Sequence, residues 1–163
     1  MADQVFDAIA VRSLRVSSET YFYPANSGKV GATSGFAFTN NKGTVTVPAS
    51  TSGATLTIPL KLKEGNIIKS FKVSGQIESA GSTVTVDADL RATTAAAGDL
   101  TDASVGAIDV ISKTADHKIV EEKTGLSHTV ITGNSYYVLI TVTTGTSTDV
   151  DFQGVEVTVE RRK

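Results

Sequence analysis

The chain has no cysteine and no tryptophan, and it has only three prolines in 163 residues. Without cysteine, neither a disulfide framework nor a thiolate metal site can form. No apolar run approaches the ~18 residues that a membrane-spanning helix requires, so a transmembrane protein is not expected. The chain begins without a basic segment followed by an apolar one, so we expect no signal peptide and synthesis in a cytoplasm.

Neither sign of charge dominates. There are 15 Lys and Arg residues against 17 Asp and Glu residues, for a formal net charge of -2. Proteins that bind nucleic acid or anionic membranes through broad electrostatic contacts carry a basic excess. The sequence therefore predicts no nucleic-acid partner and no membrane partner.

Alternation of apolar and polar residues is the main positive signal. From residue 45 to residue 159, short alternating runs rich in Val and Thr are separated by clusters of Gly, Ser, Asn and Asp. A period of two is typical of half-buried β-strands. About eight strands are expected after residue 43, with turn signals every 8 to 12 residues. That spacing predicts an all-β fold, an antiparallel β-sandwich of jelly-roll type with an N-terminal arm.

Residues 1–40 differ from the β-sandwich domain predicted at residues 41–163. Apolar residues in the first part mix helical and strand spacing, and both a helical turn and a strand fit residues 6–15. We interpret residues 1–40 as an arm and loop for attachment or oligomerisation. Its interface candidates are Val5, Phe6, Ile9, Val11, Leu14, Tyr21, Phe22 and Tyr23.

Several turns and loops are predicted within the sandwich. Ser79 to Ser82 predict a turn, and residues 108–111, 118–122 and 128–131 predict three separate strands. The stretch from Ala92 to Ala107 has little to bury, so it predicts a long loop with one helical turn capped at Thr101 or Asp102. Pro59 predicts an edge position or a strand end, and Lys69 predicts a bulge or rim.

The residues offer little for catalysis. His117 and His128 are the only imidazoles, and their spacing fits no helical metal motif. Asp116 precedes His117, but adjacent residues on a strand point to opposite faces and cannot form a relay. We therefore interpret both histidines as exposed residues at strand ends, and no enzyme and no cofactor are expected.

Two pairs of carboxylates are candidates for acid–base chemistry or calcium binding. Asp87 and Asp89 share one strand face, as do Asp149 and Asp151, about 7 Å apart by the strand rise. Such pairs serve in glycosidases and calcium sites. For Asp87 and Asp89 we favour solvation of an outer face, with Arg91 beside them. Asp149 and Asp151 stay weak metal candidates, because a loop there could wrap a cation.

Half of the aromatic residues lie within 18 positions. Tyr21, Phe22, Tyr23, Phe36 and Phe38 form this group. An exposed aromatic strip stacks on sugars or anchors an interface. We favour the alternative, in which alternate members fill the core and the others cover it.

Three segments carry a family resemblance. They are the Ile58-Pro-Leu-Lys-Leu-Lys-Glu-Gly-Asn-Ile-Ile-Lys-Ser-Phe-Lys-Val run, the Gly133-Asn-Ser-Tyr-Tyr-Val-Leu-Ile strand opening, and the closing Phe152-Gln-Gly-Val-Glu-Val-Thr-Val. This pattern of strand boundaries, from residue 56 to the end, resembles the jelly-roll domains of tailed-bacteriophage virion proteins. The resemblance implies a structural role in a virion, as a capsid decoration, head-fibre or tail-associated protein.

The resemblance also implies partners. A capsid decoration protein binds and stabilises the capsid surface, so the major capsid protein is the expected partner, after synthesis in the host cytoplasm. A homotrimer is expected, and an oligomer would cover exposed strand edges. The alternative, from another class, is a carbohydrate-binding β-sandwich module of a tail or fibre protein. A glycosidase using the paired acids is the third hypothesis.

Overall fold

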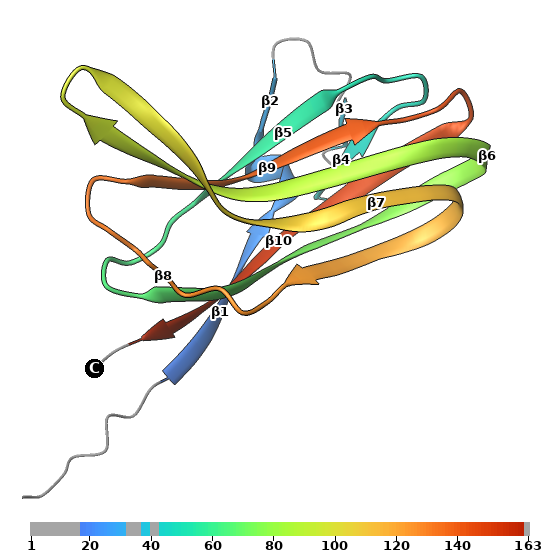
Figure 1. Ribbon diagram of the computed structural model, residues 1–163. Coiled ribbons are helices and arrows are strands. Elements are labelled where there is room, and N and C mark those ends of the chain that lie inside the picture. Colours follow the sequence, from blue (N-terminus) through green and yellow to red (C-terminus); the bar gives the residue numbers. More distant parts are fainter. Residues whose placement is uncertain (1–16, 32–36, 40–42, 162–163) are drawn as a thin grey trace, which may run out of the picture.

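The chain folds as one antiparallel sheet that curls over on itself into a sandwich (Figure 1). This computed structural model describes residues 17–31, 37–39 and 43–161. The elements are β1 (Ser17–Pro24), the 3₁₀ turn η1 (Ala25–Ser27), β2 (Lys29–Val30), β3 (Ala37–Thr39), β4 (Thr44–Val47), β5 (Ala54–Leu60), β6 (Ile67–Ala96), β7 (Asp99–Lys123), β8 (His128–Thr129), β9 (Ser135–Thr143) and β10 (Thr148–Arg161). The predicted antiparallel β-sandwich is confirmed.

The long strands β6 and β7 belong to both layers of the sandwich. Residues 67–79 of β6 pair with β10, whereas residues 85–93 pair with β9. The β6–β7 ribbon therefore turns back between these halves, as Figure 1 shows. We name the layers after their central strands. The β9 layer contains β2, β5, β9 and the tip-side half of the ribbon; the β10 layer contains β1, β3, β4, β8, β10 and the other half.

The core lies between the two layers. Alternate residues of β5, β6 and β9 bury one face of the β9 layer, as the period of two requires. Phe71, Phe152 and the valines of β10 fill the opposite side and are almost fully buried. Burying an apolar side chain of this size stabilises a fold by about 1.5–3 kcal/mol. In the described part of the chain, no helix is long and apolar enough to span a membrane.

The predicted loop from Ala92 to Ala107 is wrong. These residues form the end of a β-hairpin, in which Ala92 pairs with Ala103 and Ala96 pairs with Asp99. Neither Thr101 nor Asp102 caps a helical turn, because both lie in β7. The hairpin forms because backbone pairing needs no buried side chain, and Gly98 supplies the positive φ of 103° at its two-residue turn.

Other predicted boundaries change for related reasons. The turn expected at Ser79 to Ser82 is a bend inside β6, where Gly81 has a φ of 94°. The separate strands expected at 108–111 and 118–122 are parts of the continuous strand β7, and the third shortens to β8. Lys69 lies at a register shift between β6 and β10, which confirms the predicted bulge. Pro59 pairs with Tyr137 of β9 on one side of β5. On the other side, β2 pairs with only two residues of β5, and Pro59 lies beyond them.

Part of the first 40 residues belongs to the sandwich. β1 pairs with β10 over its whole length, from Ser17 opposite Arg161 to Pro24 opposite Gly154. Ala25 of η1 is fully buried in the core. The apolar residues from Val5 to Leu14, with their open choice between helix and strand, lie outside the described residues.

Candidate functional site

A row of polar side chains crosses four strands on the outer face of the β10 layer. Thr46 of β4 lies opposite Asp151 of β10, Asp151 lies opposite Gln76 of β6, and Gln76 lies opposite Lys118 of β7. Directly opposed residues in an antiparallel sheet point to the same face. At the usual strand spacing, the four strands place these side chains along about 14 Å. We call this set the polar row.

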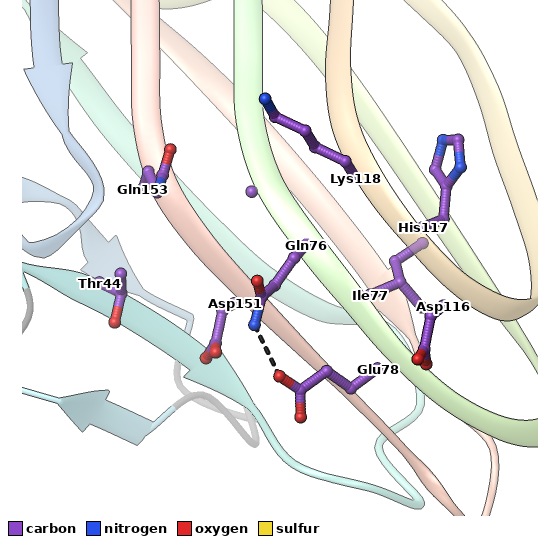
Figure 2. Close-up of a pocket in the computed structure, with 10 residues that line it drawn as sticks. Thr44, Gln76, Ile77, Glu78, Asp116, His117, Lys118, Asp151 and Gln153 are labelled. Carbon is purple, nitrogen blue, oxygen red and sulfur yellow. Dashed lines mark hydrogen bonds between the residues drawn. The ribbon is translucent and has the colours of Figure 1, made fainter.

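The polar row borders a groove. Asp151, Gln76 and Lys118 line an opening of about 650 Å³ together with residues of the neighbouring row. Figure 2 shows Gln76, Glu78 and Asp151 pointing toward one another there. The other lining residues are Thr44, Gly75, Ile77, Asp116, His117 and Gln153.

Hydrogen bonds hold the carboxylates of the groove in place. Gln76 Nε2 donates to Glu78 Oε1 at 2.6 Å, and the Ser79 N–H donates to Asp116 Oδ1 at 2.9 Å. The Thr46 hydroxyl donates to the Asp151 carboxylate. Three carboxylates and one lysine therefore face the opening, so its charge is negative, and fixed acceptors dominate its chemistry.

Gly75 explains how β6 and β10 come together beneath the groove. A Cβ on Gly75 would lie 2.3 Å from the carbonyl oxygen of Asp151, which is closer than real Cβ atoms approach. A β-bulge in β10 lies at the same level, where the register shifts between Phe152 and Gly154. The bulge and the missing side chain together fix the register that aligns the polar row.

His117 does not join the acids of the groove. Its ring and the Asp116 carboxylate point in opposite directions (Figure 2), as predicted for neighbours on a strand. His117 Nε2 lies 3.8 Å from Glu121 Oε1. The prediction of an exposed strand-end residue is wrong for His117, because it is half-buried within β7.

His128 begins β8 and is also half-buried rather than exposed. Its Nε2 lies 3.1 Å from the hydroxyl of Tyr136, and the two rings meet edge to face with centroids 5.5 Å apart. The Tyr136 hydroxyl also accepts a hydrogen bond from the Ile131 N–H at 3.1 Å. This contact attaches the loop before β9 to the core.

The weak metal candidates lie on one strand. The Ala49 N–H donates to Asp149 Oδ1 at 2.9 Å, and the Thr46 hydroxyl donates to Asp151. Each carboxylate thus binds the β4 side of the sheet. Within the residues that the structure describes, no group of three His, Asp or Glu side chains is placed to hold a metal ion.

A second polar cluster lies on the outer face of the β9 layer. Arg91 donates from Nη1 to Asp89 Oδ2 at 2.6 Å and from Nε to Asp102 Oδ2 at 2.8 Å. Tyr137 donates to Asp102 Oδ1 at 2.8 Å, and Ser104 donates to Asp89 Oδ1 at 2.5 Å. The predicted contact between Asp89 and Arg91 is confirmed. The cluster connects β9, β6 and β7 at the base of the hairpin.

Electrostatics reinforce this cluster. Partial burial raises the pKa of Asp102, but the hydrogen bonds from Tyr137 and Arg91 outweigh it and leave the pKa below its usual value. The hydrogen bond to Asp102 raises the pKa of Arg91, and partial burial raises that of Tyr137. The charged forms of Arg91 and Asp102 therefore stabilise each other.

The aromatic residues of β1 alternate between core and solvent. Tyr21 and Tyr23 pack against the core, whereas Phe22 is 56% exposed. The Tyr23 hydroxyl donates to the carbonyl of Lys61 at 2.9 Å, and burial raises its pKa. The alternation agrees with the core interpretation for these three residues. Phe36 lies outside the described residues.

Sequence reasoning missed most of the groove. Thr46, Gln76 and Lys118 lie 30 to 42 residues apart in sequence order, and only the strand register brings them together. The one usable signal is the outward position of Gln76 and Glu78 in an alternating strand. Asp151, a metal candidate from sequence, is the only groove residue that was selected for a site.

The structure therefore defines a jelly-roll-like β-sandwich with a polar groove across one outer face. No model of a known protein family matches the chain. No curated protein matches it.

Solved structures show a limited likeness to this chain at low identity. The CBM22-1 and GH10 modules of xylanase 10B from Clostridium thermocellum are 13% identical, with a TM-score of 0.47 over 90% of this chain and 28% of that one. The C-terminal CBM6 of LamC from Zobellia galactanivorans is 14% identical, with a TM-score of 0.43 over 85% and 98%. A family two carbohydrate esterase from Cellvibrio japonicus is 10% identical, with a TM-score of 0.38 over 90% and 36%.

This chain thus spans about a third or less of the xylanase and esterase chains. At these identities and TM-scores the likeness carries no argument about function. We therefore argue function from the geometry of the groove.

Proposed function

We propose that this chain is a non-catalytic carbohydrate-binding module, and that glycans bind in the groove of the β10 layer. The polar row carries the proposal, because it sets hydroxyl, carboxylate, amide and ammonium groups across four strands. A saccharide presents hydroxyl groups that both donate and accept, and such a mixed set of fixed partners satisfies both roles. Asp151, Gln76 and Lys118 of the row line the groove, and Thr44 is its lining residue on β4. An extended oligosaccharide crossing the strands would therefore meet one polar side chain per strand.

The charge of the groove favours one class of glycan. Glu78, Asp116 and Asp151 surround a single basic residue, Lys118. Like charges in close contact disfavour a ligand, so uronic-acid or sulfated glycans would be repelled. We infer that the ligand is a neutral oligosaccharide.

The affinity is expected to be weak. None of the residues lining the groove is Phe, Tyr or Trp, so a bound sugar has no large aromatic ring on which to stack. Each hydrogen bond contributes only about 0.5–1.5 kcal/mol after exchange with water. A dissociation constant near 1 mM, which corresponds to about 4 kcal/mol, fits such a site.

The direct test is a glycan array followed by titration of neutral and acidic oligosaccharides at millimolar concentration. Gln76→Leu keeps the volume of the central side chain and removes its hydrogen bonds, so we expect about fivefold weaker binding. Thr141→Val, on the outer face of the β9 layer, is the matched control. Equal affinity for Gln76→Leu and the unchanged chain would contradict the proposal, as would binding of acidic glycans alone.

Two further measurements distinguish the proposal from calcium-dependent binding and from glycan hydrolysis. Chelator should leave binding unchanged, because Asp149 and Asp151 already accept hydrogen bonds from β4 and the loop after it. The bound oligosaccharide should be recovered intact, since the groove carboxylates are held as acceptors. Hydrolysis that disappears in Asp151→Asn would establish a glycosidase instead.

A role in virion assembly is the second candidate function. The strand β7 favours it, because the described part of the chain gives β7 one strand partner only, and self-association is what a coat or fibre protein needs. We propose capsid decoration, with the major capsid protein as partner, as the form this role would take. Binding of the purified chain to capsids that lack it, measured by co-sedimentation, tests the idea; no co-sedimentation would contradict it.

A further inference from the structure

The edge of the β10 layer is formed by the second half of β7. Residues 117–123 pair with residues 71–77 of β6, and among the described residues no strand covers their other side. Such an edge presents a row of unpaired N–H and C=O groups to any strand that approaches. Proteins blunt edges with proline, very short strands or charged side chains. β7 is 25 residues long and contains no proline, and the charges on its outer face, Lys118 and Glu122, are of opposite sign. An edge of this kind is a template for pairing.

The side chains along this edge suit another strand. Val120 is 48% exposed on the outer face, between the exposed residues Lys118 and Glu122. Ile119 is fully buried on the opposite face, so the strand is firmly anchored to its own core. The edge thus combines a rigid backbone with an exposed apolar residue between opposite charges.

Among axes placed at residues 118 to 122, the edge is complementary to itself in one register. When Val120 faces Val120 of a second copy across a two-fold axis, Lys118 of each copy lies opposite Glu122 of the other. Moving the axis to Lys118 or Glu122 opposes like charges, and moving it to Ile119 places Asp116 opposite Glu122. Opposite charges directly across a strand pair are favourable, and like charges are not.

We propose that a second copy of this chain pairs with β7 in antiparallel orientation, with the two-fold axis at Val120. The two β10 layers then form one continuous sheet, as isologous dimers do. Lys118, the last member of the polar row, would lie at the seam beside Glu122 of the second copy. The dimer would therefore extend the polar row across both copies, although the pairing itself does not rest on glycan binding.

Light scattering of the unchanged full chain gives the first test. A mass of twice 17.0 kDa, reached as concentration rises, is expected. A monomer at all concentrations overturns the proposal. A trimer also overturns it, because a two-fold contact at Val120 cannot close a ring of three, and would support the trimer expected from the virion resemblance.

A cysteine placed at the axis tests the register. The chain has no cysteine, so Val120→Cys introduces a single thiol. Directly opposed Cα atoms lie about 4.5–5.5 Å apart, which a disulfide can bridge. Val110→Cys is the matched control, because Val110 is also exposed on β7 but lies in the β9 layer. Fast oxidation of Val120→Cys to a covalent dimer is expected, and equal oxidation of both variants overturns the register.

Charge reversal supplies an independent test. Glu122→Lys opposes lysine to lysine twice across the axis, and the dimer dissociation constant should rise at least tenfold. Combining it with Lys118→Glu restores two pairs of opposite charge and should restore dimerisation. Asp109→Lys makes the same charge change on β7 outside the proposed contact and should have no effect. Failure of the double variant to recover, with its circular dichroism spectrum unchanged, overturns the pairing.

Discussion

The two halves of the β6–β7 ribbon share one backbone ladder but have different surroundings. In the β10 layer, β6 has β10 on its other side, and Phe71 and Ile119 are fully buried. In the β9 layer, β9 begins opposite Thr93, and the hairpin extends past this point, with Leu100 73% exposed. Hydrophobic burial holds both halves where they lie within a layer, as at Phe71 and Leu90, whereas backbone pairing holds the hairpin end beyond Thr93. The comparison shows that regular strands do not require a buried face along their whole length.

Truncation of a core side chain should give the largest difference in stability between the buried part of the ribbon and its hairpin end. Phe71→Ala removes a fully buried ring, and we expect a loss of about 3–5 kcal/mol in the free energy of unfolding. Leu100→Ala, at the hairpin end, should change it by less than about 0.5 kcal/mol. Urea denaturation of both variants measures the difference. A comparable loss of stability in both variants would mean that Leu100 is packed against other side chains.

Two glycines give a smaller contrast. Gly75→Ala forces a Cβ against the backbone of β10, so we expect a loss of about 1–3 kcal/mol. Gly106→Ala, in the hairpin half, meets only the end of the Leu126 side chain at 2.7 Å, which can rotate away. The same denaturation experiment should rank Gly75→Ala well below Gly106→Ala in stability. The reverse order would contradict the close approach of β6 to β10.

The polar cluster should give the smallest effect. Asp102→Asn removes one charge from the Arg91 network, and exposed ion pairs contribute about 0.2–1 kcal/mol. Because the folded pKa of Asp102 is lowered, its contribution is complete above the ordinary aspartate pKa and disappears as pH falls through the lowered value. Amide exchange of residues 94–101 should be up to about fivefold faster in the variant at neutral pH.

Amide exchange measured at acid pH is the control for that prediction. At a pH below the lowered pKa of Asp102, the variant and the unchanged chain should exchange at equal rates when compared at the same pH. Tyr137→Phe, which removes a donor to Asp102, should reproduce part of the neutral-pH effect. A difference that persists unchanged into acid would show that the charge of Asp102 is not responsible.

Alternation in the sequence predicted the strands that bury one face. The runs ending at Leu60, Leu90 and Val142 alternate cleanly because their polar neighbours face water. The hairpin end has both faces exposed, so residues 94–101 carry no apolar period, and the same composition that indicates a loop is compatible with strand pairing. The register of Ala96 opposite Asp99 leaves a two-residue turn with Gly98, which was the available signal.

The groove was less predictable than the fold. Whether Asp151, Gln76 and Lys118 meet depends on strand order, and a shift of one residue in any pair would send a side chain to the other face. Single-strand patterns fix the face of each residue but not its neighbours across the sheet. The bulge opposite Gly75 sets the register, but a glycine is its only visible sign in the sequence.

The central position of β10 has a consequence for the order of folding. β10 lies between β6 on one side and both β1 and β4 on the other, so it joins segments up to 144 residues apart, such as Ser17 and Arg161. During synthesis, the Val and Phe residues of β1, β4 and β6 emerge long before their common neighbour. Closing such long loops costs entropy before any contact compensates it. The β10 layer therefore cannot complete its pairing until residues 148–161 have been translated.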